Sequence, residues 1–265
     1  MIITIKMLFR DINFAWRTRR FWFFTATSRT RARFARTTLG SFWLGFSNLL
    51  SISTLGIVYG TVFSVDDFQS YFIYLGIGLV IWNSISSSIS SAPDLFAHNS
   101  QNIRNINIKP IFYTLEEWAF QIQTFFQSFI LVFLVFLFIN RELLINFLLF
   151  SWLPMANLII FLYWFPLLIC LIGVKYTDFS QLVPIILQLV FLTSPILYRK
   201  DNLGSLQWIT DYNLIYKMLD PLRTSLIEGQ INYKTLIITL LFNILGLTIS
   251  FVFLNRKIKE LPFLV

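Results

Sequence analysis

Residues 118–139 read WAFQIQTFFQSFILVFLVFLFI, a run of twenty-two positions without a charged side chain. Because about 20 helical residues cross the hydrocarbon core of a bilayer, this run predicts a transmembrane helix. Five further apolar runs predict five more spans, and the six lie near residues 38–63, 69–90, 118–139, 149–174, 180–198 and 233–254. The sequence therefore predicts an all-α, polytopic membrane protein that forms a single transmembrane domain over residues 1–265.

The composition excludes an ordinary soluble domain. The 265 residues are 56% hydrophobic and only 13% charged, whereas a soluble globular protein carries roughly 25% charged residues. The chain has one cysteine, Cys170, and one histidine, His98. A disulfide scaffold and a cysteine-based metal cage are therefore excluded.

Catalytic motifs are absent from the sequence. It contains no G-x-x-x-x-G-K-[ST] phosphate loop, so the chain does not bind ATP by that route. It also shows no Ser/His/Asp set and no pair of carboxylates inside one span. We therefore expect a protein that is not itself an enzyme and holds no catalytic residue, metal or cofactor of its own.

Three longer polar stretches interrupt the spans, at residues 1–37, 92–117 and 199–232. The first interleaves nine Lys and Arg with Phe and Trp, which is typical of an amphipathic helix lying in the membrane interface. A nucleic-acid-binding arm would have a similar composition. The adjoining span favours the interfacial helix, so we expect membrane lipids as partners and no nucleic acid.

The distribution of basic residues predicts the orientation of the chain. If the amino terminus is cytoplasmic, fifteen of the 21 Lys and Arg fall in cytoplasmic segments. The positive-inside rule therefore favours a multi-pass protein with both termini in the cytoplasm, which for a bacterium means insertion in the inner membrane.

Neutral polar side chains share helix faces within the predicted spans. Ser47, Ser51 and Thr54 lie on one face of the first span, and Ser84, Ser87, Ser88 and Ser91 form a hydroxyl strip on the second. Glu117, Gln121, Thr124 and Ser128 share a face of the third. Such strips suit a passage for carbohydrate, but small hydroxyl residues also allow helices to pack closely in lipid. Both interpretations remain open from the sequence.

Four blocks in order resemble a known family over essentially the whole chain. They are RARFARTTLGSFW at Arg31–Trp43, GLVIWN at Gly78–Asn83, the polar segment Asn99–Pro110, and VPIILQLVFLTSPILY at Val183–Tyr198. Together they are similar to the membrane subunit of ABC-2 type exporters of polysaccharides such as O-antigen, capsule or teichoic acid. Ser41 departs from the family pattern, which often has proline at this position.

The resemblance implies a homodimer of six-span subunits that pairs with a separate ATP-binding subunit, on which ATP and magnesium reside. The substrate-channel candidates are Ser47, Ser51, Thr54, Tyr71, Tyr74, Trp82, Gln188, Phe191 and Tyr198. The candidates for coupling to the ATPase are Asn99, Gln101, Asn102, Arg104, Asn105 and Lys109. The family also implies re-entrant helices that gate the exit within residues 199–232, with Trp208, Asn213, Tyr216 and Arg223 as candidates.

The resulting interpretation is the transmembrane subunit of an ATP-driven exporter of lipid-linked polysaccharide. Two alternatives stay open: an ABC-2 exporter of a lipid or small amphiphile, and an energy-independent pore or membrane scaffold.

Overall fold

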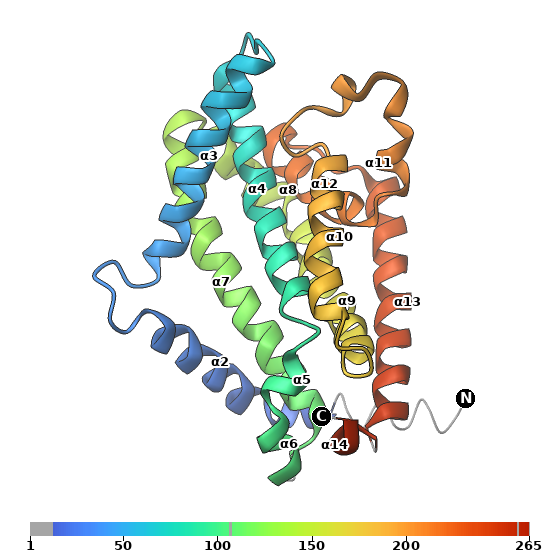
Figure 1. Cartoon of the computed structure of the whole chain (residues 1–265). Coiled ribbons are helices and arrows are strands. Elements are labelled where there is room, and N and C mark those ends of the chain that lie inside the picture. Colours follow the sequence, from blue (N-terminus) through green and yellow to red (C-terminus); the bar gives the residue numbers. More distant parts are fainter. Residues whose placement is uncertain (1–12, 106–107, 259, 265) are drawn as a thin grey trace.

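Long helices form a bundle, with short helices at each of its ends (Figure 1). The computed structural model describes residues 13–105, 108–258 and 260–264, and these contain helices, turns and loops but no strand. The helices are α2 (Arg19–Phe34), α3 (Phe42–Val62), α4 (Phe68–Ser90), α5 (Leu95–His98), α6 (Ser100–Asn105), α7 (Pro110–Ile139), α8 (Glu142–Phe150), α9 (Trp152–Gly173), α10 (Phe179–Thr193), η1 (Lys200–Leu206), α11 (Trp208–Tyr212), α12 (Leu214–Glu228), α13 (Tyr233–Lys257) and α14 (Leu261–Leu264).

Five of these helices, α3, α4, α7, α9 and α13, are long and apolar enough to cross a membrane. The sixth predicted span corresponds to α10, an apolar helix of 15 residues. It is shorter than the predicted span 180–198 because Ser194 adopts extended backbone immediately before Pro195. The residue before a proline is biased away from helical geometry, so the helix ends there. The prediction of an all-α polytopic protein is confirmed.

The polar stretch 92–117 is divided rather than continuous. Its first part forms the short helices α5 and α6, and its last eight residues belong to α7, which begins at Pro110. Proline suits the first turn of a helix because its missing N–H would have no intrahelical partner there. Glu116 and Glu117 therefore lie inside α7, and the predicted span 118–139 is the later part of a longer helix.

Side-chain caps fix where several helices begin. The Asp67 carboxylate accepts a hydrogen bond from the Ser70 backbone N–H at 3.1 Å and starts α4. The side chains of Asn213 and Asn232 accept equivalent bonds at the starts of α12 and α13. Gly229, at φ +62°, then ends α12 in the left-handed conformation that glycine adopts without strain.

Several glycines allow close packing in the bundle, and Gly76 and Gly246 show the tightest approaches to rings of neighbouring helices. A Cβ on Gly76 of α4 would collide with the ring of Phe136 on α7, which is fully buried. A Cβ on Gly246 of α13 would lie 2.5 Å from the Trp164 indole of α9. Small residues let membrane helices approach closely, and the bulky partner fills the space left by the missing side chain. Large apolar side chains such as Phe138, 92% exposed, cover the outside, as expected of a surface that contacts lipid.

The short helices sit at opposite ends of the molecule. Helices α5, α6 and α14 lie at one end, called here the α5–α6 end, while α11 and α12 lie at the other, called the α12 end (Figure 1). Helix α12 is not a surface loop: it packs against α4, α8 and α9, and Leu219, Leu222 and Leu226 on it are fully buried. The helices expected between the fifth and sixth spans are therefore present, and α12 is folded into the bundle while α11 packs on α12 at its edge.

Candidate functional site

Polar side chains from three helices form a series at the middle of the bundle, joined in two separate hydrogen-bonded sets. The Asn48 amide on α3 donates to the Ser128 hydroxyl on α7 at 2.5 Å. The Asn83 amide on α4 donates to the Asn48 side-chain oxygen at 2.6 Å. Ser87, one turn further along α4, donates to the Gln121 side-chain oxygen on α7 at 3.0 Å. Each of these groups is neutral, and each has a partner.

The series continues toward the α5–α6 end and terminates in an ion pair. Ser91 and the Gln121 amide both donate to one oxygen of Glu117, at 3.0 and 2.8 Å. The other oxygen of Glu117 lies 2.5 Å from the guanidinium of Arg29 on α2. We call the set Asn48, Asn83, Ser87, Ser91, Gln121 and Glu117 the polar track.

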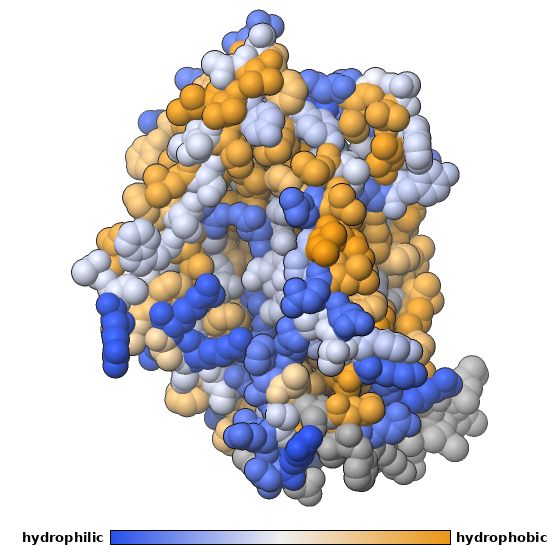
Figure 2. Space-filling view, in the orientation of Figure 1, coloured by the Kyte–Doolittle hydropathy of each residue, from blue (hydrophilic) through white to orange (hydrophobic). Residues whose placement is uncertain are grey.

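Part of the polar track is open to the exterior. Asn83 and Ser87 are exposed, and Asn48 and Ser91 are half-buried. Figure 2 shows hydrophilic surface that rises from the α5–α6 end into the middle of this face, between apolar regions. A polar surface at this depth is costly against lipid, because lipid tails offer no hydrogen bonds. Such residues normally face a bundle interior or a water-filled cavity.

At the α12 end, side chains from two helices hold the non-helical segment that follows α10. The Tyr71 and Tyr74 hydroxyls of α4 donate to the carbonyl oxygens of Leu197 and Pro195, at 2.7 and 2.9 Å. The Arg223 guanidinium of α12 donates to the same Pro195 oxygen at 2.8 Å. This segment, residues 194–198, is therefore clamped between α4 and α12.

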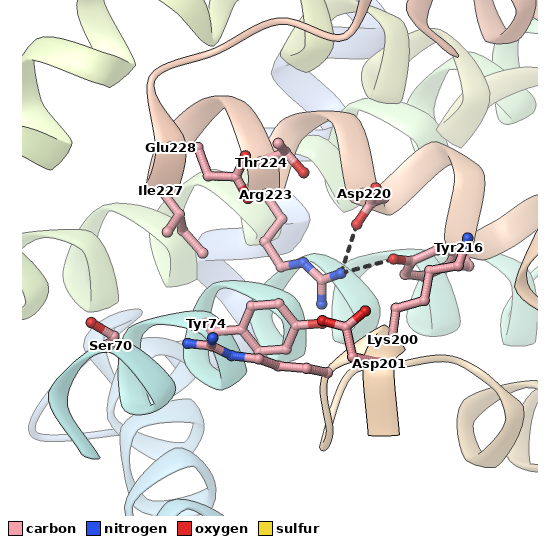
Figure 3. A pocket seen from close by; sticks show the side chains of 11 residues that line it. Ser70, Tyr74, Lys200, Asp201, Tyr216, Asp220, Arg223, Thr224, Ile227 and Glu228 are labelled. Atoms are coloured by element: carbon pink, nitrogen blue, oxygen red, sulfur yellow. Dashed lines mark hydrogen bonds and ion pairs between the residues drawn. The ribbon is translucent and has the colours of Figure 1, made fainter. Parts of the chain in front are cut away.

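Arg223 is the centre of this arrangement and is only 2% exposed. Its guanidinium donates to Asp220 at 2.7 Å and lies 4.0 Å from the centre of the Tyr74 ring, in cation–π geometry. Figure 3 shows Tyr216 and Asp220 on the same side of the guanidinium, with the Tyr74 ring directly below it in this view. Burial alone would lower the pKa of Arg223, but the nearby Tyr74 and Asp220 raise it by more. The net pKa is therefore raised, and the side chain stays cationic.

A pocket of about 480 Å³ opens beside Arg223. Basic and acidic side chains alternate around it, and it includes Tyr74, Arg199, Lys200, Asp201, Asp220 and Glu228. Lys200 pairs with Asp211 at 3.2 Å, but both side chains are well exposed, so this ion pair is weak. The balanced charge gives the pocket no preference for an anion or a cation.

The predicted channel residues occupy three kinds of position. Ser47, Ser51, Thr54 and Gln188 are exposed. The three hydroxyls donate to backbone carbonyls of their own helix, three or four residues back. Tyr71 and Trp82 are buried in the bundle, where Trp82 packs on Phe191 with ring centres 5.3 Å apart. Tyr74 and Tyr198 lie at the clamp.

Most of the predicted coupling residues form one surface. Gln101, Asn102, Arg104 and Asn105 are exposed on or at the end of α6. Asn99 and Lys109 are half-buried, and the Lys109 ammonium lies 4.7 Å from the centre of the Phe14 ring. Helix α6 therefore presents amides and a guanidinium on the exposed surface of this end.

Three of the four predicted gate residues converge. Asn213 donates to Ser194 at 2.8 Å, and Tyr216 and Arg223 meet with nitrogen and oxygen 3.4 Å apart. Burial raises the pKa of Tyr216 well above its usual value, so its hydroxyl stays protonated. Trp208 lies apart, 58% exposed, and packs edge-on against Tyr212.

Sequence reasoning identified some polar faces but not how they join. The predicted strips on the second and third spans meet through Ser87 and Gln121, and through Ser91 and Glu117. Asn48 and Asn83 were not predicted as site residues, although Asn83 closes the GLVIWN block. An asparagine inside an otherwise apolar span was the available signal, because burying an amide in lipid requires a partner.

Comparison with known proteins covers most of the bundle. No curated protein matches the sequence. The profile of the ABC-2 type transporter family matches residues 23–227, which extend from α2 to the end of α12 and include the polar track and the clamp. The chain therefore belongs to the ABC-2 type transporter family.

Proposed function

We propose that this chain is the membrane subunit of an ATP-driven exporter in which two copies form a conduit for a lipid-linked polysaccharide. Family membership makes the chain a transport permease subunit that works with an ATP-binding partner. The proposal adds the homodimer, the polymer substrate and the orientation, with both termini in the cytoplasm of a bacterium and the protein in its inner membrane.

The observation that carries the proposal is the exposed part of the polar track. Asn83 and Ser87 are open to the exterior at the depth of the apolar spans. A second copy facing this side would cover them and leave polar walls on both sides of a passage. Exposed Ser47 and Ser51 on α3 and Gln188 on α10 extend the surface available to that passage.

The chemistry of the polar track fits a neutral, hydroxyl-rich substrate. Its side-chain amides and hydroxyls both donate and accept hydrogen bonds, as sugar hydroxyls do. The track holds one carboxylate, and Arg29 neutralises it. No fixed charge would therefore hold a sliding polymer at one position.

The short helices at the α5–α6 end would receive the motion of the ATPase. A link already connects this end to the rest of the bundle, because Ser180 at the start of α10 donates to Asp94, just before α5, at 2.5 Å. A displacement of α5 would pull on α10 and, through residues 194–198, on the clamp at the opposite end.

Co-purification and export test this proposal together. The tagged chain is extracted in mild detergent, and the ATP-hydrolysing subunit that accompanies it is quantified. The variant Arg104→Glu, combined with Asn102→Ala, should reduce recovery of the ATPase, while Glu142→Gln in exposed α8 should not.

The same variants are scored for polymer at the cell surface. If the wild-type chain recovers the ATPase and the Arg104→Glu/Asn102→Ala variant loses it while every surface polysaccharide stays unchanged, the polymer conduit is contradicted and export of a lipid or amphiphile is favoured. A chain that never recovers an ATPase would favour a pore or scaffold.

A further inference from the structure

A second polar cavity, of about 380 Å³, lies where the polar track meets α5. Ser91 and Glu117 belong to both the track and the cavity. The other polar side chains on its wall come from three segments: Arg29 on α2, then Asp94, His98 and Asn99 at α5, and Tyr113 and Glu116 on α7. The cavity is therefore continuous with the proposed conduit and lies at its α5–α6 end.

Tyr113 on the wall of this cavity has a hydroxyl with no hydrogen-bond partner among the described residues. The side chain is only 4% exposed. Buried polar groups are nearly always paired, and an unpaired one has a considerable energetic cost. A hydroxyl kept in this state indicates that something other than this chain satisfies it.

The acceptors around Tyr113 also exceed the available donors. Glu117 is fully engaged with Arg29, Ser91 and Gln121. Glu116 makes no hydrogen bond or ion pair with the described part of the chain, and one oxygen of Asp94 accepts from Ser180 while the other has no such bond. Three carboxylates therefore face one guanidinium and the imidazole of His98.

This excess negative charge restricts which chemical classes of ligand the cavity can bind. A phosphate or a uronic acid would be repelled by the uncompensated carboxylates. An ammonium group would satisfy the carboxylates but offers no acceptor for the hydroxyl proton of Tyr113. A sugar residue supplies several hydroxyls, each of which donates to a carboxylate and accepts from a phenol at the same time.

We propose that this cavity is a binding site for one neutral sugar residue, held by Tyr113 and Glu116 at the cytoplasmic mouth of the conduit. The inference rests on the proposed function, because it places the sugar next to the polar track through which the polymer would pass. In this inference, the part of the lipid-linked substrate that first contacts the chain is a sugar residue and not a phosphate of the lipid carrier.

Binding is measured by saturation-transfer NMR on the full chain in nanodiscs. The neutral probes are maltotriose, triacetylchitotriose and L-rhamnose, with D-glucuronate and spermidine as charged probes. At least one neutral sugar should receive magnetisation, with an apparent affinity at least threefold tighter than that of glucuronate or spermidine.

Two variants test whether the NMR signal comes from sugar bound in this cavity. Tyr113→Phe removes only an unpaired hydroxyl, so its melting temperature should not fall, yet sugar binding should weaken at least threefold. Glu116→Gln should weaken binding similarly, and Glu142→Gln, an exposed acid in α8, should leave it unchanged.

Three results would overturn the inference: no transfer to any neutral sugar, tighter binding of spermidine or glucuronate, or full binding by both cavity variants. Recovery of the ATPase is scored on the same preparations. If the ATPase is retained while sugar binding fails, the cavity assignment alone is wrong. If the ATPase is absent as well, the proposed exporter fails with it.

Discussion

Replacing Arg223 with methionine removes the centre of the clamp at the α12 end while nearly preserving volume. The wild-type guanidinium donates to the Pro195 carbonyl at 2.8 Å and to Asp220 at 2.7 Å, and lies 4.0 Å from the centre of the Tyr74 ring. Arg223→Met loses all three interactions. Segment 194–198 then keeps its bonds to α4, to Asn213 and to the end of α10.

The expected loss follows from the strength of these contacts. Hydrogen bonds to a charged group each contribute about 1.5–3 kcal/mol. Removing a buried charge offsets part of this, because its desolvation cost disappears. Asp220 is 34% exposed and can be rehydrated. We expect a net loss of about 2–3 kcal/mol, which for a chain of this size lowers the melting temperature by about 5–10 °C.

The assay is thermal unfolding of purified protein in one detergent, with two companion variants. Lys200→Met breaks the exposed ion pair with Asp211 in the same pocket, and should cost at most about 1 kcal/mol. Arg223→Lys keeps the charge without the planar fork, so it should fall between wild type and Arg223→Met. If Arg223→Met melts together with Lys200→Met, Arg223 does not hold the clamp.

Two further predictions concern α4. Gly76→Ala would overpack the contact with Phe136 and cost about 1–3 kcal/mol of stability. Gly78→Ala should melt at or above wild type, because its Cβ would meet only ordinary contacts at 3.5 Å. Equal melting temperatures for the two variants would contradict the packing of Gly76 on Phe136. Bonds from Ser70 lower the pKa of Asp67, so its cap contributes above the unfolded carboxyl pKa and is lost as pH falls through the lower folded value. The melting difference between wild type and Asp67→Ala should therefore be constant near neutral pH and close in acid, and a difference that persists below both values would refute it.

The sequence predicts where the helices lie along the chain better than it predicts which helices pack against each other. Uncharged runs of span length identify five long helices and α10, because lipid imposes both length and composition. Hydropathy cannot indicate where a helix stops outside the membrane, so the extension of α7 back to Pro110 was missed. The end of α10 before Pro195 was readable in principle, because proline biases the preceding residue away from helix.

The site was harder to predict, because periodicity shows which residues share a face but not what that face contacts. Tyr71 and Trp82 were grouped with exposed residues as channel candidates, yet the structure buries both against α10 and the segment after it. The bond between Asn83 and Asn48 joins positions 35 apart. No local pattern encodes such a pairing.

Thiol accessibility at Asn83 tests most directly whether the polar track lines a water-filled conduit. The native background is low, because the single cysteine, Cys170, is fully buried. Asn83→Cys should react with a membrane-impermeant thiol reagent in intact complexes, and a stalled polymer should protect it. Leu134→Cys, on the 52% exposed apolar surface of α7, should stay unreactive in lipid. If Asn83→Cys reacts no faster than Leu134→Cys, with or without polymer, the polar track does not line a conduit.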